Sequence, residues 1–168
     1  MPRPIVAYVR FVEAVNYRVG RIAMYLLYAM MGILIWSTLS KVTPWPSIWT
    51  LEMAQFVMVA YYMLGGPYSL QLDSNVRMDL LYHRWSPRTR AWVDAFSVFA
   101  LLFYLGVLLY GAVESTIYSV EYAERSATAW RPYLWPIKTV MCIAVFLMLL
   151  QAIAFFFRDV AKIRGEEI

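Results

Sequence analysis

The sequence contains one cysteine, Cys142, and one histidine, His83, among 168 residues. A lone cysteine excludes a disulfide within the chain and any metal site built from several cysteines. A membrane cytochrome needs a facing pair of histidines, so a haem- or quinone-linked anchor of a respiratory enzyme is disfavoured. No glycine-rich nucleotide loop occurs either, because Gly65-Gly66 lies inside an apolar run rather than after a strand. The sequence therefore predicts no catalytic residue, no cofactor and no metal.

Charge is also scarce, since 15% of the residues are charged and 62% are hydrophobic. Soluble domains average roughly 25% charged and 45–50% apolar residues. A soluble fold of this size could not bury so much apolar surface, whereas a bilayer supplies the missing apolar phase. The net charge of +4 comes without a basic stripe interleaved with aromatics, so nucleic acid is not an expected partner.

Four long uncharged runs are the main feature that is present. Each has 18 to 20 residues, and they cover residues 22–39, 53–72, 95–113 and 139–157. About 20 helical residues cross a hydrocarbon core of ~30 Å, and lipid offers backbone groups no hydrogen-bond partners. The sequence predicts an all-α membrane protein with four transmembrane helices in a single domain, residues 1–168.

The first 20 residues lack the pattern of a secretory signal. Apolar side chains recur there at gaps of three and four, while Arg10, Glu13 and Tyr17 occupy another face. This pattern predicts an amphipathic helix over 1–20 that lies in the membrane interface. The alternative is a simple extension of the first span.

The positive charges are unevenly distributed among the segments between the spans. Eleven of the 15 Lys and Arg residues lie in the amino-terminal arm, the 73–94 loop and the tail. The positive-inside rule therefore predicts that both termini and this loop are cytoplasmic. All seven tryptophans lie near span ends or in loops, as expected for aromatic belts at the headgroup level.

Glycines inside the spans predict local features. Gly65-Gly66-Pro67 predicts a packing kink in the second span, although a broken span can also mark a substrate site. Gly106 and Gly111 predict close helix contact in the third span. No span carries an ionisable residue at mid-depth, where such residues persist mainly on ion or substrate paths. The chain is thus a poor candidate for the moving part of a transporter.

The outer segment 114–131 is predicted to continue the third helix. Glu114, Glu121 and Glu124 would share one face, and Glu121 would precede Arg125 by one turn. Three acids on a helix face are either a solvated surface or a docking surface for a partner.

Several motifs occur in a fixed order along the chain: Trp49 with Glu52, the run Asn75-Val76-Arg77-Met78-Asp79-Leu80-Leu81-Tyr82, the basic element Ser86-Pro87-Arg88-Thr89-Arg90 with Asp94, and the outer segments Tyr122 to Pro132 and Pro136-Ile137-Lys138. Together they resemble the motifs of one family, the small membrane subunits of tripartite ATP-independent periplasmic (TRAP) transporters. The resemblance covers nearly the whole chain, which ends at Ile168 after a charged tail and so looks like the separate, unfused form of the subunit.

The resemblance implies a scaffold in the bacterial inner membrane. Such subunits anchor a large elevator-type subunit, which carries the substrate and sodium sites, and help to dock a periplasmic binding protein that delivers organic acids, commonly carboxylates. Two other hypotheses stay open beside it: a standalone four-helix carrier or channel acting as a homo-oligomer, and the respiratory anchor described above.

Candidate contact residues follow from the family pattern. Arg77 and Asp79 would form an interfacial clamp to the partner or to a lipid phosphate, and otherwise they are ordinary positive-inside anchors. Arg84 and Arg88 belong to the same basic loop, facing the large subunit or membrane phospholipids. Trp49 and Glu52 would contact a partner at the outer face, and Glu121, Glu124 and Arg125 would help to dock the binding protein.

Overall fold

The computed structural model of the chain describes residues 3–72 and 87–164. In this part the regular elements are four helices: α1 (Arg3–Ser40), α2 (Thr50–Gln71), α4 (Pro87–Glu121) and α5 (Trp135–Arg164). The prediction of an all-α membrane protein is confirmed.

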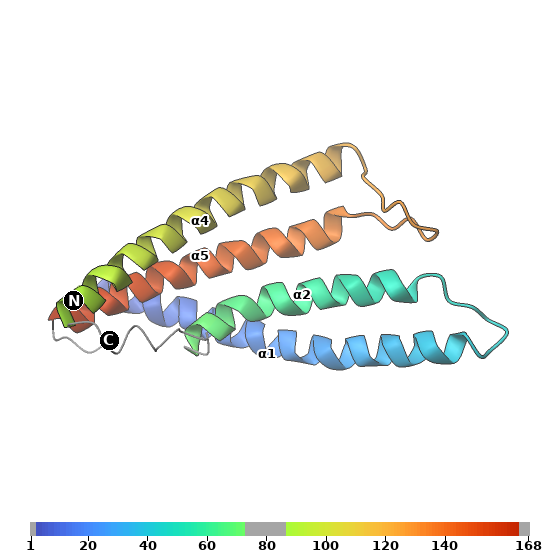
Figure 1. Cartoon of the computed structure of the whole chain (residues 1–168), viewed down its shortest axis with the longest axis horizontal. Coiled ribbons are helices and arrows are strands. Elements are labelled where there is room, and N and C mark those ends of the chain that lie inside the picture. The colour runs from blue at the N-terminus through green and yellow to red at the C-terminus, as the bar shows by residue number, and fades with distance from the viewer. Residues whose placement is uncertain (1–2, 73–86, 165–168) are drawn as a thin grey trace.

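The helices form two hairpins whose turns lie at the same end of the bundle (Figure 1). α1 packs along α2, and α4 packs along α5. α5 also contacts α1 and α2, so it holds the two hairpins together. The start of α1 and the end of α5 lie together at the opposite end (Figure 1). α4 packs mainly along α5 and leaves its other faces uncovered.

Three helical segments are long and apolar enough to cross a membrane, namely Arg3–Ser40, Phe96–Glu121 and Trp135–Arg158. They contain the predicted first and fourth spans, and the predicted third span from residue 96 onward. α2 has 22 residues, about 33 Å at 1.5 Å per residue, so its length suffices. It is not among the three, because tyrosines, glutamines, glycines and a proline are spread along it and no stretch of 18 residues is apolar enough. The second span therefore stays a prediction.

The amino-terminal segment is continuous with the first span, because α1 runs unbroken for 38 residues. The predicted separate interfacial helix over 1–20 is therefore wrong. The structure has the alternative, an amino-terminal extension of the first span. The reason is packing: Val9 and Val12 are buried against Ala154 of α5. The apolar face of residues 3–20 thus covers another helix of the same chain.

A buried pair of amides joins α1 to α5. The Nδ2 of Asn16 donates to the Oε1 of Gln151 at 2.6 Å, and the two residues are 1% and 0% exposed. The remaining polar atoms, Asn16 Oδ1 and Gln151 Nε2, have no hydrogen-bond partner among the described residues. On the same interface, Arg158 pairs with Glu13 at 2.9 Å. These polar contacts fix how α5 lies against the amino-terminal half of α1.

The amide pair predicts non-additive substitutions. Asn16→Leu alone should lower the free energy of unfolding by about 1–3 kcal/mol, because the Gln151 amide stays buried without a partner. Adding Gln151→Leu should recover part of that loss. Unfolding of both single variants and the double variant in detergent measures the coupling. Strictly additive losses would contradict the role given to the pair.

α1 and α2 approach each other closely at Gly20. A Cβ atom there would lie 2.4 Å from both Cβ and Cγ of Tyr68. These atoms are anchored to the α2 backbone and cannot move aside without moving the helix. Gly32, on the same helix, has no atom within 4 Å of its Cβ position. Only the first of these glycines is required by packing.

Gly20→Ala should therefore destabilise the chain by about 1–3 kcal/mol, the usual range for overpacking. Gly32→Ala is the matched control, and it should stabilise α1 by roughly 0.5–1 kcal/mol because alanine favours helix. Thermal unfolding of both variants in the same detergent makes the comparison. Equal changes in stability for Gly20→Ala and Gly32→Ala would contradict close packing of α1 against α2 at Gly20.

Within the described part of this chain, Gly106 and Gly111 do not serve close helix contact, because a Cβ at either position meets no atom within 4 Å. For contacts inside the chain, the prediction for these two glycines is wrong. The physical reason is that both lie on the uncovered side of α4, where no helix of this chain is close enough to need them small.

Candidate functional site

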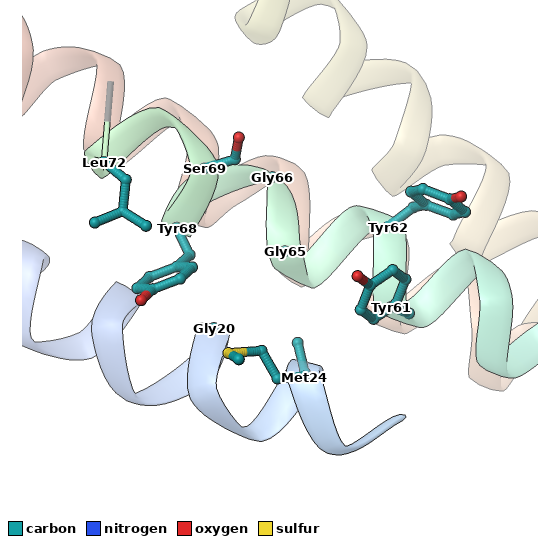
Figure 2. Close-up of a pocket in the computed structure, with 10 residues that line it drawn as sticks. Gly20, Met24, Tyr61, Tyr62, Gly65, Gly66, Tyr68, Ser69 and Leu72 are labelled. Atoms are coloured by element: carbon teal, nitrogen blue, oxygen red, sulfur yellow. The ribbon is translucent and has the colours of Figure 1, made fainter. Parts of the chain in front are cut away.

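A groove of about 420 Å³ lies between α1 and α2. Gly20, Ala23 and Met24 line it from α1. Figure 2 shows Tyr61 and Tyr68 of α2 on either side of Gly65, which faces α1 across the groove. The lining is mostly apolar and aromatic, and it includes no Asp, Glu, Lys, Arg or His side chain. The sequence did not predict this groove as a site.

The Gly65-Gly66-Pro67 sequence lies at the middle of this groove's α2 wall. A Cβ at Gly65 would meet no atom within 4 Å, whereas a Cβ at Gly66 would lie 3.2 Å from the Met148 sulfur on α5. Gly65 therefore lies on the open face of α2, and Gly66 lies on the face that packs against Met148 of α5. Pro67 is buried and lacks an N–H, so the Met63 carbonyl loses its regular helical donor. α2 nevertheless stays helical to Gln71.

At the other end of the bundle, Glu124 holds the turn between α4 and α5. Its Oε2 lies 2.7 Å from the Lys138 Nζ and also accepts a hydrogen bond from the Ser119 hydroxyl. Its backbone carbonyl accepts from the Leu134 N–H at 3.0 Å. The hydrogen bond from Lys138, followed by that from Ser119, holds the pKa of the Glu124 carboxyl below its usual value.

Arg125 belongs to the same turn. Its guanidinium stacks over the Tyr133 ring, 4.3 Å from the ring centroid, and donates to the Tyr133 hydroxyl. α4 ends at Glu121, and Ala123 has a φ of 46° that turns the chain away from helix. The predicted helical continuation is thus correct only to Glu121. Glu124 and Arg125 lie beyond the helix, so the predicted shared face and the Glu121–Arg125 helical pair are wrong.

Glu124 predicts a pH dependence. A lowered pKa means that the folded state favours the carboxylate, so its stabilisation is present above the usual glutamate pKa and is lost as pH falls through the lowered value. The wild-type melting temperature should drop on acidification below about pH 4 more than that of Glu124→Gln, which has no charge to lose. An equal fall in melting temperature for the two proteins on acidification would contradict this role of Glu124.

Trp49 and Glu52 lie at the start of α2. Trp49 is the N-cap residue, and Glu52 occupies the first turn, where the positive end of the helix dipole favours an acid. Glu52 is only 7% exposed, and its Oε2 has no hydrogen-bond partner in the described part of the chain. Whether the two residues contact a partner chain stays a prediction.

A chain of hydroxyl groups that the sequence did not indicate closes the α1–α2 turn. Ser40 and Ser47 lie 2.7 Å apart, Ser47 and Thr50 lie 3.2 Å apart, and Thr50 donates to Ser37 at 3.1 Å. In the sequence, these contacts could have been suspected only from the four small hydroxyl residues that lie near the end of α1 and the start of α2.

The remaining predicted contact residues fall mostly in the central loop. Arg77, Asp79 and Arg84 lie outside the described residues. Arg88 lies in the first turn of α4. Within residues 3–72 and 87–164, no group of three or more His, Cys, Asp or Glu side chains could hold a metal ion.

The helices and their uncovered apolar surface define a multi-pass membrane protein. Comparison with known families gives a finer result. Residues 30–162 match the family described as "Tripartite ATP-independent periplasmic transporters, DctQ component". The match covers well over half of the chain, which therefore belongs to this family of transporter components. No curated protein matches the chain.

Proposed function

We propose that this chain is the scaffold subunit of a binding-protein-dependent secondary transporter in the bacterial inner membrane. Its expected partners are a large elevator-type membrane subunit and a periplasmic binding protein. Sodium as the coupling ion and an organic acid, such as a carboxylate, as the solute are the choices that the family pattern supports. The proposal rests on membership of the family and on the features of the helices described below.

The observation that carries the proposal is the uncovered surface of α4. Phe96, Phe99 and Phe103 lie on one face of this helix, and they are 73%, 70% and 69% exposed. α4 packs mainly along α5, so this face is free for lipid or another membrane chain. Apolar helices with open faces suit a subunit that packs beside a larger one.

The absence of charge inside the helices supports a passive role. Between Arg21 and Lys41, and between Asp94 and Glu114, the sequence has no acidic or basic residue. The described polar contacts, such as Asn16–Gln151 and Glu124–Lys138, connect helices or close a turn. Solute and ion sites then belong to the large subunit.

The proposed orientation places both termini in the cytoplasm. Arg3, Arg10 and Arg158 belong to the end of the bundle where α1 begins and α5 ends, and Lys41 and Lys138 belong to the end with the two turns (Figure 1). The positive-inside rule favours the first end as cytoplasmic. The turn held by Glu124 and Arg125 then faces the periplasm, where a binding protein could reach it.

The central loop is proposed as the cytoplasmic contact with the large subunit. Arg77 and Asp79, with Arg84 and Arg88, would bind the large subunit or phospholipid phosphates. Charge-assisted hydrogen bonds of this kind are stronger than neutral ones.

Purification and reconstitution test the function. The affinity-tagged chain should co-purify with a much larger multi-pass protein from native membranes. Vesicles should take up an organic acid only when they contain both membrane subunits and the binding protein is present. Vesicles with the large subunit but without this chain are the control. Uptake by vesicles that contain this polypeptide alone would contradict the proposal and favour a standalone homo-oligomeric carrier.

A further inference from the structure

We propose that the groove between α1 and α2 binds one acyl chain of an anionic glycerophospholipid, whose phosphate is held by Arg21. This site is separate from the proposed transport role, because a lipid can bind the isolated chain whether or not any solute is carried.

The walls of the groove suit a hydrocarbon chain. Its volume of about 420 Å³ falls in the ~300–1,000 Å³ range of small-molecule sites. The open side lies between α1 and α2, with Met24 and Gly65 facing each other across it (Figure 2). A charged solute would find no charged partner in the lining. A flexible acyl chain needs no directional partner, because close contact with apolar side chains is sufficient.

The length of the groove matches one leaflet of a bilayer. On α2 the lining runs from Tyr61 to Leu72, which is about 16 Å at 1.5 Å per residue. Half of a hydrocarbon core of ~30 Å is a similar depth. On α1 the groove begins at Gly20, beside Arg21, after which the sequence is uncharged until Lys41. The cationic end of the groove is therefore at the headgroup level.

Arg21 supplies the charge complementarity. Its guanidinium carbon lies 5.7 Å from the centre of the Tyr17 ring, and Tyr17 packs edge-on against Tyr68, which lines the groove. Arg21 is exposed, and no carboxylate in the described part of the chain pairs with it. Glu13, the acid of α1, is paired with Arg158. Arg21 thus follows the groove residue Gly20 in the sequence and has no carboxylate partner among the described residues, an arrangement that suits a phospholipid whose acyl chain enters the groove.

Native mass spectrometry of the purified full chain tests the site, with phosphatidylglycerol and phosphatidylcholine as probes. The wild-type chain should prefer phosphatidylglycerol by about tenfold, the effect of one charge-assisted contact. Arg21→Gln should remove this preference. Arg10→Gln, which changes an exposed arginine three turns away on the same helix, is the matched control and should keep it.

Filling the groove is the second arm of the test. Gly65→Leu places a side chain where no atom lies within 4 Å, so it should enter the groove and lower bound phosphatidylglycerol about tenfold. Gly106→Leu makes the same change at an equally open position on α4 and should have no effect. Met24→Trp narrows the groove from the α1 side, with Met31→Trp as its control, in case Gly65→Leu does not fold.

The proposal would be overturned by equal retention of the two lipids by the wild-type chain, by unchanged lipid retention in both groove variants, or by equal losses in the groove variants and their controls. Gly65→Leu could instead release the large subunit without changing the lipid bound to the isolated chain. The groove would then hold a helix of that subunit, which would also overturn the lipid assignment.

Discussion

The structure depends on how little of its apolar surface the chain can cover by itself. Helices of 38, 22, 35 and 30 residues are joined into two hairpins, and α5 packs against each of the other three helices. Large side chains such as Phe99 and Tyr28 are about 70% exposed. In water this surface would drive association, whereas in a bilayer it is solvated by lipid or by another membrane chain. The hydrophobic effect therefore places the chain in the membrane but does not assemble its helices.

Close packing and a few polar contacts must then determine which helices pack together and in which arrangement. Gly20 lets the α2 backbone approach α1, and Gly66 leaves room for Met148 of α5. The Asn16–Gln151 amides join α1 to α5, and Glu124 with Lys138 ties the ends of the second hairpin. In an apolar medium an unpaired amide finds no water, so such contacts select one arrangement of the helices. Each of these contacts lies between helices or at a turn, which agrees with a rigid supporting role.

Much of this fold was predictable from sequence, because long uncharged runs have few alternatives to helices in a membrane. Three of the four predicted spans lie in helices that meet the length and composition needed, and membership of the transporter family agrees with the motifs. Which side chains meet was not predictable. Lipid-facing and helix-facing surfaces are both apolar, so Gly106 and Gly20 look alike in the sequence although only Gly20 is packed. The Asn16–Gln151 pair joins residues 135 positions apart, a separation at which local pattern carries no information.

The central claim is that this chain stays still while its partner moves. Spin labels at the exposed positions Leu39 and Ile117, in a chain with Cys142 replaced by serine, would report the separation of the two hairpins. The measurement is pulsed electron paramagnetic resonance on the assembled transporter, with and without solute and its coupling ion. A single distance distribution that does not change between the two conditions is expected. A shift or a second population on adding solute would contradict the account.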